Sequence, residues 1–229
     1  MFARAFSLTW IAYCGYYLCR KNFSVLMPYL KTEQGYTSET LAHVLFIYSV
    51  AYSLGQFGMG HLADRFGARI VVMAGALVSA ACSPLTGTAF PLAVSQYVNG
   101  VAQASGWPGV LKLSRDWFPE ANLGVVMAWW GTHLVVGGFI ATNLAAALTA
   151  GGVWRRAAWV PSILLALVGI GFGLLARDKA RSPEAGSAVK APLRGSLPLT
   201  RPLLAIAALY FCVKLTRYSF LFWLPLYLS

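Results

Sequence analysis

The chain has 229 residues, of which 58% are hydrophobic and only 11% are charged, and its mean hydropathy is +0.63. This composition excludes a soluble globular domain and indicates an integral membrane protein. The net charge of +11 does not predict a nucleic-acid partner, because the basic residues are scattered over loops between hydrophobic stretches instead of forming one stripe.

Seven apolar stretches are long enough to cross a bilayer, which takes about 20 helical residues. We expect helices near residues 5–30, 38–63, 69–88, 90–115, 122–150, 154–176 and 202–228. The first stretch lacks the cleavage site of a removable signal, so we expect it to be retained as a span. The sequence therefore predicts an all-α membrane protein with a six-helix bundle over 1–176, a cytoplasmic linker loop over 177–201 and a seventh helix over 202–229.

The distribution of basic residues between the loops predicts the orientation. If the N-terminus is cytoplasmic, the outer segments carry only Lys31, Arg155 and Arg156. The cytoplasmic segments then carry Arg4, Arg65, Arg69, Lys112, Arg115, Arg177, Lys179, Arg181, Lys190, Arg194 and Arg201. The excess of inside cations favours this orientation, and we expect a multi-pass protein of a bacterial cytoplasmic membrane.

Four cations remain inside the predicted spans, namely Arg20, Lys21, Lys214 and Arg217, while all seven acidic residues fall in loops or at helix ends. A charge at mid-membrane costs roughly 2.5–3.5 kcal/mol on insertion scales and usually marks the path of an ion or substrate. Guanidinium groups match the oxygens of a phosphate bidentately. The predicted ligand is therefore a phosphorylated or similarly anionic small molecule.

Two predicted helices each present tyrosine and cation on one face at helical spacing. In the first helix this stripe contains Tyr13, Tyr17 and Arg20. In the last helix it contains Tyr210, Lys214 and Arg217. Lys21 is turned about a quarter of a circle away from the first stripe. The alternative is that the cations snorkel or bind helix carbonyls, and this alternative is stronger for the two lysines than for the two arginines.

The segment from Gly60 to Arg69 reads GHLADRFGAR. It resembles the G-x-L-a-D-R-x-G-r-R loop between the second and third helices of the major facilitator superfamily. The conformational motif would comprise Gly60, Asp64, Arg65, Gly67 and Arg69. Glycines let helix ends approach closely, and we expect Asp64 to engage helix termini and neighbouring arginines. The alternative is a basic turn without such a role.

Further segments are similar to the organophosphate:phosphate antiporter family, which includes glycerol-3-phosphate and hexose-6-phosphate exchangers. The first is YYLCRKNF over residues 16–23, followed by MPYL over 27–30. The others are Asn99-Gly100 with Gln103, Gly106-Trp107-Pro108, His133 before Gly137-Gly138, and Arg217-Tyr218 followed by Trp223, Pro225, Tyr227 and Leu228. The resemblance covers essentially the whole chain.

This resemblance implies alternating access of two six-helix bundles around a site at the membrane midplane. It implies that Arg20 and Arg217 bind the phosphate group, that His133 contributes to substrate binding and that Tyr13 and Tyr17 line the pathway. It also implies exchange of the organophosphate for inorganic phosphate. Judged from its surroundings alone, His133 is as often a packing residue as a ligand.

Three further positions are candidates for the substrate site. Gln56 stands where well-known bacterial members have a lysine in the second helix, which leaves the particular organophosphate open. Trp107 and Trp129 would stack on a sugar or fill the bundle, and packing is favoured. No metal site, cofactor or enzyme activity is predicted, because His43, His61 and His133 fall in separate segments without metal-ligand spacing.

The number of predicted helices departs from the family pattern, because family members have twelve helices and this chain has seven. We expect the N-terminal half of such a carrier plus the first helix of the second half. Three function classes stay open: an antiporter, completed by a separate chain or seen as a truncated product; a sugar-phosphate-sensing receptor; and a fragment that does not transport. The free cysteines Cys14, Cys19, Cys82 and Cys212 lie in apolar stretches and predict no disulfide framework.

Overall fold

The computed structural model describes residues 2–86, 88, 91–178 and 200–228, without the side chains of 120, 221–222, 225–226 and 228. The chain divides into two units, Met1–Asp178 and Lys179–Ser229. Most of the predicted linker over 177–201 lies outside the described residues. The second unit contains one helix, α10 (Arg201–Leu228).

The first unit is a bundle of helices, and no strand occurs among the residues described. Its elements are α1 (Phe2–Gln34), α2 (Ser38–Phe66), α3 (Ala68–Cys82), the short 3-10 helix η1 (Ser83–Leu85), α4 (Leu92–Gln103), α5 (Gly106–Trp117), α6 (Glu120–Trp130), α7 (His133–Thr149) and α8 (Arg156–Leu175). The predicted all-α architecture is confirmed.

Two of the predicted helices are interrupted. The stretch predicted over 90–115 forms α4 and α5, separated by Ala104 and Ser105. Pro108 lacks an N–H and its ring clashes with the carbonyl four residues earlier, at Ala104, which favours an interruption there. The stretch predicted over 122–150 forms α6 and α7, separated by Gly131 and Thr132.

Five helical stretches are long and apolar enough to span a membrane: Ser38–Phe66, Ala68–Leu85, Ala121–Thr149, Arg156–Leu175 and Arg201–Phe220. The predicted spans 5–30 and 90–115 do not meet this criterion within the described residues. The first contains Arg20 and Lys21, and the second consists of two short helices that carry polar residues inward. These two spans are less apolar than the other five because they carry the polar residues of the bundle interior.

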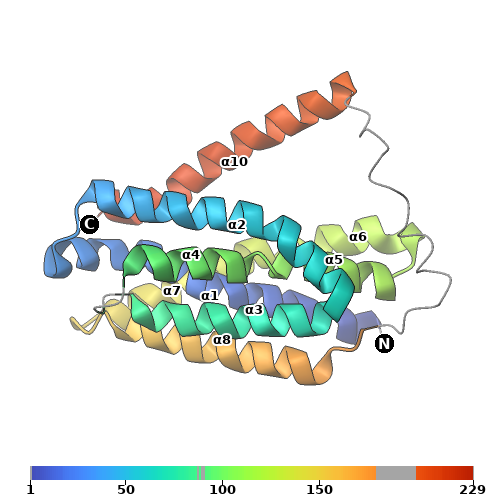
Figure 1. Cartoon of the computed structure of the whole chain (residues 1–229), viewed down its shortest axis with the longest axis horizontal. Coiled ribbons are helices and arrows are strands. Elements are labelled where there is room, and N and C mark those ends of the chain that lie inside the picture. Colours follow the sequence, from blue (N-terminus) through green and yellow to red (C-terminus); the bar gives the residue numbers. More distant parts are fainter. Residues whose placement is uncertain (1, 87, 89–90, 179–199, 229) are drawn as a thin grey trace. The chain divides into compact units, whose positions relative to one another are not determined.

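The helix α1 is the centre of the first unit (Figure 1). It packs against α7, α8 and α5, while α2 packs along α4 and α3 packs against α8, α4 and α5. The middle of α1 is buried on all sides, from Tyr16 to Ser24. Because α1 is surrounded in this way, Arg20 faces other helices instead of lipid.

The contact between α2 and α4 depends on small residues, as is common between membrane helices. A side chain added at Gly100 would place its Cβ 2.6 Å from the carbonyl oxygen of Tyr48 and 2.9 Å from the Cβ of Ala51. A Cβ at Gly55 would lie 2.9 Å from the Cβ of Ala104. Glycine at both positions therefore lets the two helices approach closely.

We expect Gly100→Ala to destabilise the first unit by about 1–3 kcal/mol, because the new methyl group meets the backbone of α2. The matched control is Gly124→Ala on α6, where nothing lies within 4 Å of the added Cβ. That substitution is expected to be neutral or to stabilise by up to about 1 kcal/mol. Thermal unfolding of both variants in detergent measures the difference, and equal shifts would contradict the close approach of α2 and α4.

Candidate functional site

Arg20 is a buried cation near the middle of α1, and its side chain is 6% exposed. Its Nε donates a hydrogen bond of 2.8 Å to Oε1 of Gln103 on α4. Its guanidinium carbon lies 5.2 Å from the ring centre of Tyr17 and 4.8 Å from that of Tyr52. One edge of the guanidinium is thus held by an amide, while two aromatic rings contact the group.

The Nη2 atom of Arg20 is buried and has no hydrogen-bond partner among the residues that the structure describes. Within the same residues, the one ion pair joins Lys112 to Asp64, so no carboxylate neutralises Arg20. A buried donor without a partner costs about 1–3 kcal/mol, and more when it is charged. Such a group requires an explanation, and an anion that completes its hydrogen bonds would supply one.

Gln103 is itself held in one orientation. Its Nε2 donates to the carbonyl oxygen of Tyr16 at 3.1 Å and to the hydroxyl of Ser79 at 3.0 Å. Because Nε2 is committed to these two acceptors, the other end of the amide, Oε1, points to Arg20. The chain of hydrogen bonds continues from the Ser79 hydroxyl to Oδ1 of Asn99 at 2.7 Å. This buried network joins α1, α3 and α4 around the guanidinium.

The predicted tyrosines of α1 lie beside Arg20. Tyr13 is 4% exposed, and its hydroxyl lies 3.5 Å from the hydroxyl of Tyr52 on α2. The hydroxyl of Tyr48, one turn before Tyr52, donates a long hydrogen bond of 3.5 Å to Oε1 of Gln103. The surroundings of Arg20 are therefore rich in hydroxyl groups, which can donate hydrogen bonds to an anion, and in aromatic faces, which stabilise the guanidinium itself.

His133 is buried at the start of α7 and packs in an aromatic cluster. Its ring centre lies 4.5 Å from that of Tyr13 and 4.0 Å from that of Trp130. Its Nδ1 lies 2.5 Å from the carbonyl oxygen of Trp130, so this nitrogen is the donor. The structure thus brings His133 to the same tyrosine that neighbours Arg20.

The two predicted tryptophans differ in their placement. The side chain of Trp129 is 68% exposed on α6 and lies away from the cluster, while its neighbour Trp130 is 1% exposed within it. The inward position expected for Trp129 is therefore occupied by Trp130. Trp107 of α5 is 40% exposed and borders the cluster, with its ring centre 5.6 Å from that of Trp130 and 6.3 Å from that of Tyr13.

Two other predicted residues lie further from this arrangement. Lys21 is 8% exposed and faces α7, where its Cε would lie 3.9 Å from a Cβ at Gly138. Gln56 is half-buried on α2, one turn beyond Tyr52. Lys21 is therefore a second buried cation on α1, directed toward a different helix from Gln103.

In the second unit, Lys214 and Arg217 are half-buried on α10. The ammonium of Lys214 lies 5.0 Å from the ring centre of Tyr210 and 5.5 Å from that of Tyr218. The predicted stripe of tyrosine and cation is thus present on this helix. Arg217 lies one turn beyond Lys214.

The loop motif lies at the end of the first unit that also carries the start of α1, the turn between α2 and α3 and the residues after α8 (Figure 1). We call this the basic end. Asp64 forms an ion pair of 3.0 Å with Lys112 on α5, whose Nζ also donates to the carbonyl of Ala63 at 2.7 Å. Arg65 instead lies over the ring of Phe66. The partner of Asp64 is therefore a lysine of α5, whereas helix termini and neighbouring arginines were expected from the sequence.

A different carboxylate engages the helix terminus. Oδ1 of Asp178 accepts a hydrogen bond of 3.1 Å from the backbone N–H of Arg69 in the first turn of α3, where N–H groups lack intrahelical partners. Nε of Arg69 donates to the carbonyl of Gly173. Gly67 has a φ of +90°, and a Cβ there would meet the carboxylate of Asp178. The motif residues Gly67 and Arg69 therefore connect α3 to the end of α8. The remaining motif residue, Gly60, lies on α2 one helical turn before Asp64.

The sequence profile of the Major Facilitator Superfamily matches residues 9–229. The chain belongs to this superfamily. A glycerol-3-phosphate transporter of Bacillus subtilis (strain 168) is 31% identical over 180 residues, covering 75% of this chain and 40% of its own length. A glucose-6-phosphate exchanger of Bos taurus is 26% identical over 245 residues, covering 83% of this chain and 49% of itself. A glycerol-3-phosphate transporter of Haemophilus influenzae is 27% identical over 199 residues, covering 78% and 41%.

These similarities confirm the predicted relation to the organophosphate:phosphate antiporter family within the Major Facilitator Superfamily. The superfamily membership and the five apolar helices make the chain a multi-pass membrane protein, and the relatives reported above are named as transporters and an exchanger. The chain spans about half the length of the curated relatives that it matches.

Three residues contribute to the site although they were not predicted as site residues from the sequence. They are Gln103, Tyr52 and Trp130. A signal for the first was present, because Gln96, Asn99 and Gln103 place three amides on one face of an apolar helix at helical spacing. A polar stripe of this kind indicates an inward face. Tyr48 and Tyr52 show the same one-turn spacing on α2.

Proposed function

We propose that this chain forms the substrate-binding first half, and the following helix, of a carrier for phosphorylated small molecules. The substrate class is glycerol-3-phosphate or a sugar phosphate, exchanged for inorganic phosphate by alternating access. The relatives are named for glycerol-3-phosphate and glucose-6-phosphate, which supports a phosphate-ester substrate. The chemistry around Arg20 supports the same class.

The observation that carries this proposal is the partly satisfied guanidinium of Arg20. It is buried, it is held at Nε by Gln103 and it keeps Nη2 without a partner in the described part of the chain. A phosphate carries about −1.5 to −2 charges near neutral pH and has three acceptor oxygens. Binding of one oxygen to Nη2 would satisfy the donor and neutralise a charge that no carboxylate of the described residues pairs with.

The other predicted residues also take part in the proposed binding. Tyr17 and Tyr13 would line the path on α1, and His133 would contribute from the cluster that contains Tyr13. Arg217 on α10 would supply the second guanidinium for the phosphate. In an alternating-access carrier, cations from the two halves that share one anion draw these halves together, so binding energy would drive closure. Lys21, Gln56, Trp107 and Lys214 would surround the remainder of the substrate.

The direction and coupling are part of the same proposal. The basic end would face the cytoplasm, in agreement with the positive-inside rule. The predicted spans hold no carboxylate, since all seven acidic residues fall in loops or at helix ends. A carboxylate-based proton relay is therefore disfavoured, and exchange of one anion for another keeps the transported charge balanced.

The test is a comparison of phosphorylated and non-phosphorylated ligands. Proteoliposomes that contain the chain, alone or together with any chain that co-purifies with it, are loaded with inorganic phosphate and offered labelled glycerol-3-phosphate. We expect uptake that depends on internal phosphate, with competition by glucose-6-phosphate and none by glycerol. Saturable binding without uptake would indicate a sugar-phosphate receptor instead. Neither binding nor uptake in either preparation would overturn the proposal.

A further inference from the structure

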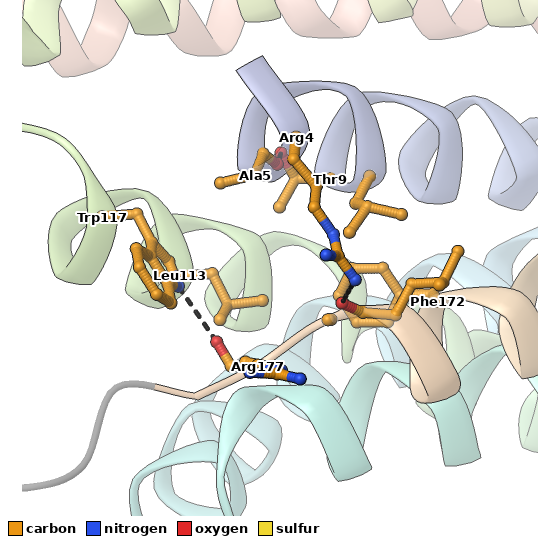
Figure 2. A pocket seen from close by; sticks show the side chains of 10 residues that line it. Arg4, Ala5, Thr9, Leu113, Trp117, Phe172 and Arg177 are labelled. Carbon is orange, nitrogen blue, oxygen red and sulfur yellow. Dashed lines mark hydrogen bonds between the residues drawn. The ribbon is translucent and has the colours of Figure 1, made fainter. Parts of the chain in front are cut away.

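A pocket opens at the basic end of the first unit, roughly three to four helical turns from Arg20 along α1 (Figure 2). Its walls come from the first turns of α1, from the last turns of α5 and from the end of α8 with the residues that follow. The apolar wall residues are Leu8, Leu113, Trp117, Phe172, Leu175 and Ala176. The pocket lies outside the arrangement around Arg20 and has no part in the proposed transport step.

Two arginines flank these apolar walls. Arg4 lies at the start of α1 and Arg177 lies two residues beyond the end of α8, and both side chains are exposed (Figure 2). Arg4 donates one hydrogen bond of 3.1 Å to the carbonyl of Leu175. No acidic residue lines the pocket, and in the described ranges neither arginine forms an ion pair. The nearby carboxylate of Asp178 accepts the N–H of Arg69.

The two arginines also lie at a particular depth in the membrane. The candidate span Arg156–Leu175 ends two residues before Arg177, which places both arginines at the level where lipid headgroups meet the hydrocarbon. Trp117 donates its indole N–H to the carbonyl of Arg177 at 3.0 Å and turns its ring to the pocket (Figure 2). Tryptophan is enriched at this depth because it combines an apolar ring with one polar group.

We propose that this pocket binds an anionic phospholipid. The headgroup phosphate would lie between Arg4 and Arg177, and an acyl chain would lie on the apolar walls formed by Leu8, Leu113 and Phe172. A free phosphate ion would leave these walls exposed to water, and a zwitterionic lipid would bring a cation to a cationic rim. The combination of two exposed arginines with apolar walls at headgroup depth therefore selects a lipid with net negative charge.

The experiment titrates the purified chain in mild detergent with phosphatidylglycerol and with phosphatidylcholine carrying the same acyl chains. Native mass spectrometry counts bound lipids, and thermal unfolding reports stabilisation. We expect a one-to-one adduct and a raised unfolding temperature with phosphatidylglycerol, and a several-fold smaller adduct with phosphatidylcholine. Inorganic phosphate at the same concentration is expected to leave the phosphatidylglycerol adduct undiminished, because a free phosphate has no acyl chain to cover the apolar walls.

Two kinds of variant locate the site. Arg4→Gln combined with Arg177→Gln is expected to lower the phosphatidylglycerol adduct several-fold, while the matched control Arg155→Gln with Arg156→Gln removes two exposed arginines elsewhere and should leave it unchanged. Ala5→Trp fills the pocket and keeps both arginines, and it should also lower the adduct. Equal adducts in the two double variants, equal binding of both lipids, or full binding by Ala5→Trp would each overturn the proposal.

Discussion

Replacing Arg20 by alanine is expected to abolish measurable binding of glycerol-3-phosphate and of inorganic phosphate. Replacing it by lysine, which keeps the charge, is expected to weaken binding by roughly 10- to 100-fold, because a charge-assisted hydrogen bond contributes about 1.5–3 kcal/mol. The difference between the two variants separates the contribution of the charge from that of the guanidinium geometry.

The geometry around Arg20 explains why lysine is a poor substitute. The guanidinium donates from Nε to Gln103 and still presents Nη2. A lysine ammonium carries its three donors on one nitrogen, so it cannot reach both Oε1 of Gln103 and the position of Nη2 with the fixed geometry of a guanidinium. It also lacks the planar group that lies near the rings of Tyr17 and Tyr52. The positive charge remains after this substitution, but the hydrogen-bond donors no longer have fixed directions.

Equilibrium binding of labelled glycerol-3-phosphate to the purified chain in detergent measures these effects, with thermal unfolding recorded for every variant. The matched control is Arg156→Ala, which removes an exposed arginine at the start of α8 and should leave affinity unchanged. Undiminished binding by a folded Arg20→Ala variant would refute the role of Arg20. A loss of equal size in Arg156→Ala would show that net charge alone attracts the ligand.

The helical fold was largely predictable because the membrane imposes a simple rule. Backbone groups in hydrocarbon must be satisfied within the segment, so a long apolar stretch becomes a helix. The interruptions were not predictable with the same rule. Proline is tolerated in membrane helices, so Pro108 could stand within a continuous helix or end one, and the packing of α5 against α1 and α3 decides. The break at Gly131 and Thr132 has no proline to mark it.

The candidate site was predictable along one helix but not between helices. Spacing places Tyr13, Tyr17 and Arg20 on one face of α1, because 3.6 residues per turn fix their relative directions. The partner of Arg20 depends on which residue of α4 lies opposite, and that depends on the rotation of α4 about its axis. The same applies to Trp129 and Trp130, which differ by about 100° in direction. Only the packing of α6 shows that Trp130 faces inward.

Gln103 provides the second large expected effect. Gln103→Met keeps a similar volume but removes the acceptor of Arg20, and we expect affinity for glycerol-3-phosphate to fall by roughly 5- to 150-fold, the equivalent of about 1–3 kcal/mol. Without Oε1 at 2.8 Å, Nε becomes a second unpaired donor, and the guanidinium is free to rotate toward the nearby tyrosines. Gln103 acts here as a positioning residue, since it acts on the ligand through Arg20.

Gln103→Glu is expected to lower affinity further. A carboxylate at this position would pair with Arg20 and compete with the phosphate for the same charge. Its second oxygen would face the carbonyl of Tyr16, 3.1 Å from the present Nε2, so we also expect a lower unfolding temperature. A purely structural role predicts that affinity follows stability across the variants. A positioning role predicts that Gln103→Glu lowers the ligand affinity more than Gln103→Met does, by more than the difference between their unfolding temperatures accounts for.

Combining the substitutions gives the decisive measurement. If Gln103 acts by orienting the guanidinium of Arg20, Gln103→Met should have little further effect once Arg20 is lysine, because the planar group that Gln103 orients is already absent. The two losses would then be strongly non-additive, with a coupling on the order of 0.5–3 kcal/mol. Additive losses in the double variant would show that Gln103 supports only the packing of α4 against α1 and α3. The geometry favours coupling, since one amide joins all three helices at the guanidinium.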